Sequence, residues 1–314
     1  MLVAVTGASG LIGTALTRRL QAEGHQVLRL TRSRPTAADQ VQWDPAAGRL
    51  DPEALAKADA VVHLAAANIG DKLRWTARTK REILETRVEG TGLVARTMAE
   101  IARGTGGPRV LVCASGAHYY GDRGDEVLTE ASSGGRGFLA DVVRQWEAAA
   151  DPARAAGLRV VHLRTGPVQD AAGAGLPKQA LMLRLVVGGR FGSGRQWLSW
   201  VALDDITGAY LHALTHDDLA GPVNAVAPNP VTNAEFTATL ARVLRRPAVL
   251  HVPAFAPKLV LGEFADEMLF ASMRVRPSRL LETGYRFQFP DLEPALSHTL
   301  GAVSGKAEST RPRP

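Results

Sequence analysis

The chain has 314 residues, 46% of them hydrophobic and 22% charged, which excludes an intrinsically disordered protein and is typical of a soluble globular one. Its single cysteine, Cys113, rules out an intramolecular disulfide, and strand-forming residues begin at position 2, so we expect no secretory signal and a cytoplasmic location. The net charge of +6 comes from scattered arginines, and no apolar run reaches the roughly 18 residues that span a bilayer, so we expect neither a nucleic-acid partner nor a membrane one.

Apolar strand patterns alternate with helical patterns through the first half of the chain. The predicted strands read LVAVTG, QVLRLTR, DAVVHLAA, RVLVCAS and LRVVHLRTG, and the helical pattern TALTRRLQAEG separates the first two. Strands that are apolar on both faces and separated by helices require a parallel sheet that is covered on both sides. The predicted fold class is therefore α/β, a doubly wound parallel sheet.

The pattern changes after Gly166, where glycine-rich segments are followed by the helical patterns LDDITGAYLHALTH and TNAEFTATLARVLRR. There is no clean linker between the two halves, so we predict a smaller lobe that is interleaved with the sheet domain. The predicted sheet domain spans residues 1–165, with 201–230 returning to it, and the lobe spans 166–200 and 231–300. Residues 304–314 have the Pro, Ser and charge content of a disordered tail.

Three glycines, Gly7, Gly10 and Gly13, stand between the first predicted strand and the helix that follows it. After a strand, Gly7 permits a tight turn, Gly10 lets the backbone approach a pyrophosphate, and Gly13 allows the helix to pack closely on the sheet. The N-terminus of the helix then presents free N–H groups to the phosphates. The strand before and the helix after the glycines favour a dinucleotide site over a plain structural turn.

The second predicted strand indicates which dinucleotide is bound. A free ribose 2′-OH is usually held by an Asp or Glu roughly 20 residues beyond the glycines, whereas a 2′-phosphate needs cations. The segment QVLRLTRSR ends without an acid, and Arg32 and Arg34 stand where that acid would be. This pattern favours NADP(H) over NAD(H); the alternative is that both arginines are simply solvated.

Several segments together resemble a known family: TGASGLIG, YYGDRGD, GSGRQWLSW, NAVAPNPVTNAEFT and RVRPSRLLETGYRF. They are similar to the atypical extended short-chain dehydrogenases/reductases, and more closely to the NAD-dependent epimerase/dehydratase-like subgroup that has an uncharacterised C-terminal domain. The resemblance covers about residues 1–300. It implies an NADP(H)-binding Rossmann domain and a C-terminal lobe that caps a substrate, and it leaves the substrate open.

Carried over residue by residue, the resemblance implies several groups of cofactor contacts. Those around the pyrophosphate are Thr6, Gly7, Ser9, Gly10, Leu11 and Ile12, with Gly13 behind them. Those at the adenosine phosphate and the adenine are Arg32, Ser33, Arg34, Trp43 and Asp44. Those beside the ribose and the nicotinamide are Leu64, Ala65, Ala66, Asn68 and, from a later strand, Thr165. His63, at the end of an apolar strand, is expected to be a packed core residue.

The catalytic pair of that family is missing from this chain. Its enzymes use a Tyr and, four residues later on the same helix, a Lys that lowers the pKa of the phenol. Aligned by Trp146-Glu147, the matching helix here places Leu139 at the Tyr position and Val143 at the Lys position, and neither can transfer a proton. Arg144 lies one residue along, about 100° round the helix, and is an imperfect substitute for the lysine.

Another group must then exchange the proton. The segment RVLVCASG delivers Ser115 to the carboxyl end of the sheet, and HYYGD places Tyr120 just beyond it. We predict Tyr120 as the proton donor and Ser115 as the hydroxyl that orients the substrate carbonyl, with one residue of slack in the alignment. The alternative is that Tyr120 packs and hydrogen-bonds structurally.

The second half also supplies polar and aromatic side chains that suit an anionic or hydroxyl-rich substrate: Lys178, Arg195, Gln196, Trp197 and Trp200. The alternative is an apolar lobe core surrounded by solvated cations. His212 and His216 lie four residues apart on one helix face, but no third ligand is near in sequence, so we expect no metal site.

These observations leave two functions open. The first is an NADP(H)-dependent oxidoreductase or epimerase acting on a small carbonyl, hydroxyl or nucleotide-sugar-like substrate. The alternative is a non-catalytic NADP(H)-binding sensor or scaffold, which the missing Tyr and Lys would explain. We favour the enzyme, because a sensor has no need of a polar, Trp-lined lobe. The sequence leaves open whether the chain forms a homodimer.

Overall fold

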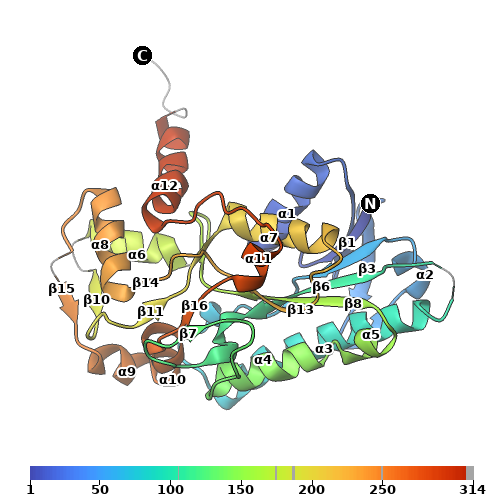
Figure 1. Cartoon of the computed structure of the whole chain (residues 1–314), viewed down its shortest axis with the longest axis horizontal. Helices are drawn as coiled ribbons and strands as arrows, with labels where there is room; N and C mark the ends of the chain where they lie inside the picture. The colour runs from blue at the N-terminus through green and yellow to red at the C-terminus, as the bar shows by residue number, and fades with distance from the viewer. Residues whose placement is uncertain (105, 174, 186–187, 249, 309–314) are drawn as a thin grey trace.

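The computed structural model describes residues 1–104, 106–173, 175–185, 188–248 and 250–308. Its centre is an eight-stranded sheet with the order β13-β8-β6-β5-β1-β2-β3-β4 (Figure 1). Neighbouring strands run parallel, except that β3 and β4 are antiparallel. The strands are β1 (Leu2–Thr6), β2 (Gln26–Thr31), β3 (Gln40–Asp44), β4 (Arg49–Leu50), β5 (Ala60–His63), β6 (Val110–Gly116), β8 (Arg159–Thr165) and β13 (Gly221–Ala225).

Helices cover both faces of this sheet (Figure 1). Val3 and Val5 of β1 pack in one core with α1 and α7, whereas Ala4 packs in a second core with α3 and α5. This alternation follows from the two-residue period of a strand, and it confirms the predicted doubly wound sheet. The helices around the sheet are α1 (Leu11–Ala22), α2 (Pro52–Leu55), α3 (Ala77–Ile101), α4 (Phe138–Ala148), α5 (Asp151–Ala155), α7 (Leu203–Thr215) and α11 (Ser278–Glu282), with the short 3₁₀ turns η1 (Ile69–Asp71) and η2 (Ala117–Tyr120).

The rest of the chain forms a lobe beside the sheet, at the left of Figure 1. Its helices are α6 (Gly175–Arg184), α8 (Asn233–Leu244), α9 (Phe255–Leu261), α10 (Glu263–Ala265), the π-helical turn η3 (Asp266–Phe270) and α12 (Leu292–Glu308). Its two-residue and three-residue strands pair as β9 (Val168–Gln169) with β12 (Val201–Ala202), β10 (Gly189–Phe191) with β15 (Leu250–Val252), and β11 (Trp197–Leu198) with β14 (Val231–Thr232). A further pair, β7 (Val127–Leu128) with β16 (Arg274–Val275), joins the loop after η2 to the C-terminal segment.

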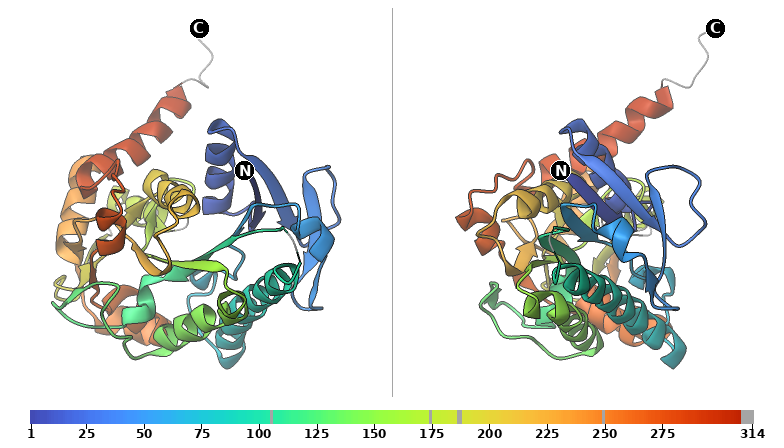
Figure 2. Two further views of the ribbon diagram at one scale, coloured as in Figure 1. Left: turned by 45° about the vertical axis from the view of Figure 1, so that its right-hand side comes forward. Right: turned by 90° about the vertical axis from the view of Figure 1, so that its right-hand side faces the viewer.

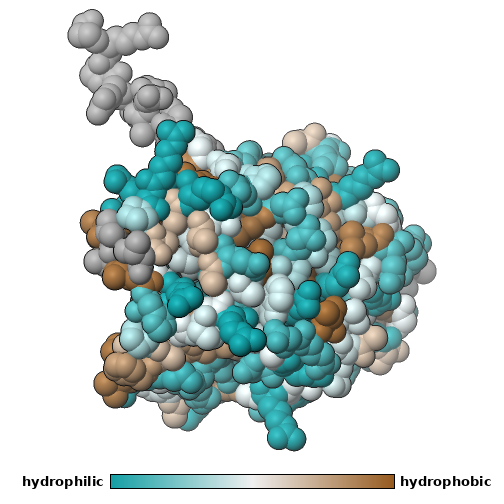
Figure 3. All heavy atoms as spheres, turned by 60° about the vertical axis from the view of Figure 1, so that its left-hand side comes forward, coloured by the Kyte–Doolittle hydropathy of each residue, from teal (hydrophilic) through white to brown (hydrophobic). Residues whose placement is uncertain are grey.

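The lobe has its own apolar core, in which Trp200, Phe236 and Phe289 pack with leucines of α6, α8 and α12. Other apolar side chains of the lobe lie at its surface, where they appear brown in Figure 3. The largest exposed ones are Leu181, Met182, Leu185, Phe255, Leu259 and Val260. Helices α6 and α9 therefore leave part of their apolar faces uncovered.

The structure departs from the predicted domain boundary at α11, which the sequence assigns to the lobe but which packs in the core of the sheet domain through Leu280. Helix α7 and strand β13 return to the sheet within residues 203–225, and α12 projects from the body in both views of Figure 2. The predicted tail, 304–314, overlaps α12 as far as Glu308, and residues 309–314 lie outside the described residues.

Candidate functional site

A cavity of about 1150 Å³ opens where β1, β2, β3 and β5 end. Because the carboxyl ends of parallel strands meet at one edge of a sheet, the loops after these strands form its wall together. The predicted residues that line it are Gly7, Ser9, Gly10, Arg32, Ser33, Trp43, Asp44, Leu64, Ala65, Ala66 and Asn68. The structure thus gathers segments from four separate strands into one cleft.

The glycine turn forms the floor of the cavity. Gly7 has a φ of 67°, and a Cβ there would lie 3.0 Å from the backbone of Leu64 and Ala65. A Cβ on Gly13 would overlap the carbonyl of Gly7, so Gly13 permits close packing of helix and turn. Helix α1 starts at Gly10 without a side-chain cap, which leaves its first N–H groups free for an anion.

Thr6 lies beneath the cavity and does not line it. Its hydroxyl accepts hydrogen bonds from the N–H groups of Leu64 (3.0 Å) and Ala65 (3.2 Å) and donates to Nδ1 of His63 (2.9 Å). Thr6 is fully buried and fixes the loop after β5, and its contact with the pyrophosphate stays a prediction. His63 is a buried core residue, as expected, and the Trp43 ring meets it edge-on.

His63 and His162 give the fold a pH dependence. Burial lowers the pKa of each to about 4, and Nε2 of His162 accepts from Arg154 (2.9 Å), which requires a neutral ring. Unfolding returns each pKa to about 6.5, so protons favour the unfolded chain and stability is lost as pH falls from about 6.5 to 4. We expect urea unfolding to show a loss of about 1 kcal/mol for each histidine between about pH 6 and pH 5.

A His162→Gln variant is the control for this pH dependence. Its amide can still accept from Arg154 but cannot titrate, so its stability should fall about 1 kcal/mol less than that of the wild type over the same pH range. An unchanged slope would contradict the assignment of His162 as a buried neutral base.

The charged side chains at the rim of the cavity differ in whether they already form an ion pair. Arg29 forms a two-bond ion pair with Asp39 (2.7 and 2.8 Å), and Asp44 pairs with Arg49 (2.9 Å), so these groups are already engaged. Arg32 is exposed and forms no ion pair within the described residues. Of the arginines at the end of β2, Arg32 lines the cavity and is available to a ligand there, whereas Arg34 is also exposed but does not line it.

One wall of the cavity comes from α3, which the sequence analysis did not include. Thr79, Glu82, Ile83, Thr86 and Glu89 line it, and their spacing of three or four residues places them on one helix face. Thr86 accepts a hydrogen bond from the N–H of Ala67 (3.2 Å) and so connects α3 to the loop after β5. The same helical spacing is visible in the sequence and could have identified this wall.

Five other predicted cofactor residues do not line the cavity: Leu11, Ile12, Gly13, Arg34 and Thr165. The side chains of Leu11 and Ile12 belong to α1, and the hydroxyl of Thr165 donates to its own strand, to the carbonyl of Leu163 (3.1 Å). Contacts between these residues and a cofactor stay predictions.

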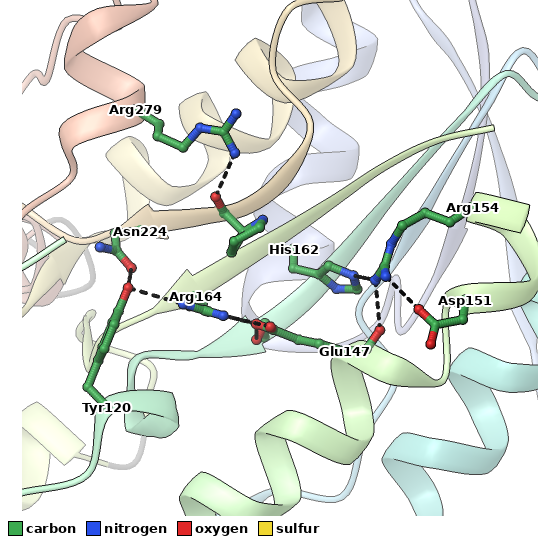
Figure 4. Close-up of polar contacts among 10 residues, drawn as sticks. Tyr120, Glu147, Asp151, Arg154, His162, Arg164, Asn224 and Arg279 are labelled. Carbon is green, nitrogen blue, oxygen red and sulfur yellow. Dashed lines mark hydrogen bonds and ion pairs between the residues drawn. The ribbon is translucent and has the colours of Figure 1, made fainter. Parts of the chain in front are cut away.

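Tyr120 belongs to a buried polar network with Arg164, Glu147 and Asn224 (Figure 4), which Ser115 joins through Glu147. Ser115 donates to Glu147 (2.7 Å), whose carboxylate also accepts two bonds from Arg164 (both 2.8 Å). Tyr120 donates to Asn224 (2.7 Å), accepts from Arg164 (3.2 Å) and has 0% exposure. The geometry favours the structural alternative for both hydroxyls, and their catalytic role stays a prediction.

The two positions that the sequence analysis aligns with the family's Tyr and Lys are apolar and packed. Leu139 and Val143 are buried on α4, and a Cβ on Gly116 would lie 3.5 Å from Val143. The N–H groups of Phe138 and Leu139 donate to the carboxylate of Glu267 from the lobe (2.6 and 2.7 Å). The carboxylate of Glu267 therefore already occupies the N-terminus of α4, where an anionic ligand could otherwise bind.

A second hollow of about 210 Å³ lies between η2 and the lobe. His118, Arg136, Lys258, Glu267 and Phe270 line it. Lys258 pairs with Asp266 (2.6 Å), and burial raises the pKa of Glu267, although its bonds to the α4 backbone oppose that shift. The hollow brings together charged groups of both signs, so its walls show no preference for anions or cations.

The aromatic residues predicted for substrate binding are engaged within the protein. Trp200 is buried in the lobe core, and Trp197 donates to Asp125 (2.8 Å) beneath the guanidinium of Arg274. Lys178 and Arg195 are exposed. The lobe thus matches the core alternative for Trp200.

The rings of His212 and His216 stack with centroids 3.5 Å apart. Across the described ranges, no three His, Cys, Asp or Glu side chains cluster as metal ligands would. Among the helices that the structure describes, none is long and apolar enough to cross a membrane.

The sequence and the fold of this chain are both similar to those of known proteins. Residues 3–226 match the NAD dependent epimerase/dehydratase family, and residues 252–299 match a domain of unknown function, DUF1731. An epimerase family protein of Mycobacterium leprae is 39% identical over 296 residues, covering 94% of each chain. The crystal structure of human epimerase family protein SDR39U1 with NADPH has a TM-score of 0.85 and 34% identity, covering 96% of this chain and 99% of that one. A nucleoside-diphosphate sugar epimerase from Corynebacterium glutamicum has a TM-score of 0.78 and 37% identity, covering 100% of this chain and 62% of that one.

Proposed function

Because the chain belongs to the NAD dependent epimerase/dehydratase family, we propose that it binds NADP(H) in the 1150 Å³ cavity and acts as an oxidoreductase or epimerase. The observation that carries this proposal is that the uncapped N-terminus of α1 and the unpaired Arg32 lie in the same cleft. The similar human protein was crystallised with NADPH, which supports the same choice of cofactor here.

We propose a position along the cleft for each part of the dinucleotide. Gly7, Ser9 and Gly10 would hold the pyrophosphate, because they line the cavity without bulky side chains beside the uncapped N-terminus of α1. Arg32 and Ser33 would hold the 2′-phosphate, beside Trp43 and Asp44 at the adenine end. The loop 64–68 would lie along the nicotinamide half.

The bound cofactor supplies hydride transfer, and the chain must position a substrate and exchange a proton. We propose that the lobe, residues 166–200 and 231–300, closes over the substrate beside the sheet domain of residues 1–165. The Corynebacterium relative is described as a nucleoside-diphosphate sugar epimerase, which supports a nucleotide-sugar-like substrate. Ser115 and Tyr120 would have to leave their buried bonds to take part.

A non-catalytic NADP(H) sensor or scaffold is the second candidate. Leu139 and Val143 are buried and apolar where the related enzymes have Tyr and Lys, which favours it. A turnover screen of the purified protein with NADPH and carbonyl or nucleotide-sugar compounds distinguishes the two. Turnover of any substrate supports the enzyme, whereas binding of NADPH with no turnover across the screen supports the sensor.

Preference for NADPH over NADH is the direct test of the cofactor. Loss of a charge-assisted contact to the 2′-phosphate should weaken binding roughly ten- to a hundred-fold, so we expect NADH to bind that much more weakly than NADPH in titration calorimetry. Arg32→Ala should bring the two dissociation constants together, because Arg32 is the unpaired cation at this end. Arg18→Ala, an exposed arginine on α1, is the matched control and should change neither. Equal constants in the wild type would refute the cofactor choice.

A further inference from the structure

Arg87 is a buried cation without a carboxylate partner. It lies on α3 with 5% exposure, and its NH1 donates to the backbone carbonyl of Ile83 (3.0 Å). Its Nε is buried and has no hydrogen-bond partner in the part of the chain that the structure describes. No ion pair joins Arg87 to an acidic side chain there.

Arg164, the other deeply buried arginine of the described chain, has the side-chain partners that Arg87 lacks there. Arg164 forms two bonds to Glu147 and a third to Tyr120, and these partners raise its pKa against the effect of burial. Burial without such partners lowers the pKa of Arg87 to about 10, so it remains a cation at neutral pH. A buried, unpaired charge destabilises a fold, and a ligand that supplies hydrogen-bond acceptors would offset that cost.

Arg87 does not itself line the large cavity, but it shares a face of α3 with Ile83, four residues earlier, which does. Ile83, whose carbonyl it contacts, lines that cavity, as does the adjacent Thr86. Thr86 in turn holds the N–H of Ala67, in the loop proposed for the nicotinamide half. Because residues four apart lie on the same face of a helix, Arg87 lies one turn beyond the part of α3 that lines the cavity at Ile83.

On its other side Arg87 contacts α4, the helix on which Val143 stands at the family's Lys position. Its guanidinium carbon lies 4.9 Å from the centroid of the Trp146 ring. Trp146 follows Val143 by three residues, which is almost one helical turn, so the two side chains share a face of α4. Val143 packs against Gly116 at the end of β6. A cation from α3 thus stands near the place where α4 presents only a valine.

We propose that Arg87 binds the nicotinamide half of NADP(H), donating hydrogen bonds to the ribose hydroxyl oxygens from α3 where α4 has lost its cation. This inference rests on the proposed function. Arginine suits the task because its planar group offers five donors, and rotation of the long side chain exchanges the Ile83 carbonyl for a ribose oxygen.

Binding of two ligands distinguishes a specific contact of Arg87 with the nicotinamide ribose from a general disturbance of the cleft. NADPH carries the nicotinamide ribose, whereas adenosine 2′,5′-bisphosphate carries the adenosine and its 2′-phosphate only. In titration calorimetry we expect Arg87→Met to weaken NADPH binding at least ten-fold and to change bisphosphate binding by less than two-fold. Arg32→Ala should weaken both ligands, and Arg96→Met, an exposed arginine on the same helix, should weaken neither.

Thermal unfolding without ligand checks the fold of the variant. Methionine has a similar length and no charge, so Arg87→Met should unfold at the wild-type temperature or above it. Unchanged NADPH affinity, or a parallel loss of both ligands with a lower unfolding temperature, would overturn the proposal. Failure of the wild type to bind NADPH would instead overturn the proposed function, and the two failures are therefore distinguishable.

Discussion

Replacing Arg164 by methionine should lower the free energy of unfolding by about 3–5 kcal/mol. The side chains of Arg164 and Glu147 are 4% and 13% exposed, and two hydrogen bonds of 2.8 Å join them. Removal of the guanidinium leaves the Glu147 carboxylate buried with only the hydroxyl of Ser115 as a donor. Tyr120 also loses the donor that its oxygen accepts from, at 3.2 Å. Urea unfolding at neutral pH measures the effect.

The double variant Arg164→Met with Glu147→Leu is the control. It removes both charges, so it should recover much of the lost stability, since apolar residues of similar volume often replace a buried ion pair at little cost. If the single and the double variant are equally unstable, the loss comes from packing and the ion pair is not its cause.

Gly10→Val should abolish NADPH binding, with a loss of at least a hundred-fold, while the chain stays folded. Gly10 has an ordinary φ of −76°, and a Cβ there would meet only the carbonyl of Gly7 at 3.3 Å, so the backbone accepts a side chain. A branched side chain at this point projects into the cavity where the pyrophosphate is proposed to lie, and it would block the free N–H groups of α1. Titration calorimetry and circular dichroism measure the two parts of the prediction.

The neighbouring glycines show why this position is the informative one. Gly13→Ala would force a Cβ into the carbonyl of Gly7, and Gly7 has a positive φ, so variants at either position would disturb the turn itself. Gly104→Ala, in an exposed turn after α3, is the matched control and should bind NADPH normally. A folded Gly10→Val protein with wild-type affinity would show that the cofactor does not use this turn.

The parallel sheet and the glycine turn were predictable because their signals are local. Buried strands read as apolar runs, and Gly7, Gly10 and Gly13 follow β1 directly, so a few adjacent residues carry each signal. The wall from α3 was missed although its helical spacing is visible. The spacing marks Thr79 and Ile83 as one face of a helix, but only the fold shows that this face lies beside the loop after β5.

The hydrogen-bond partners of the two predicted catalytic hydroxyls could not be predicted from the sequence. The sequence places Ser115 at the end of a strand and Tyr120 just after it, but it does not reveal that Glu147 and Arg164, from α4 and β8, occupy them. Such partners are 32 and 44 residues away along the chain. Their identity depends on which helix packs over which strand.

By itself, the sequence determined the doubly wound sheet, the glycine turn after β1 and the arginine after β2, because each of these depends on the order of neighbouring residues. It also determined that Leu139 and Val143 cannot exchange a proton. Only the tertiary structure decided which polar groups are free. Arg164 and Arg87 are both buried arginines, yet one meets a carboxylate and the other meets a backbone carbonyl and an indole ring. That difference arises because residues distant in sequence are brought within hydrogen-bond range by packing, and no local pattern specifies which of them will meet.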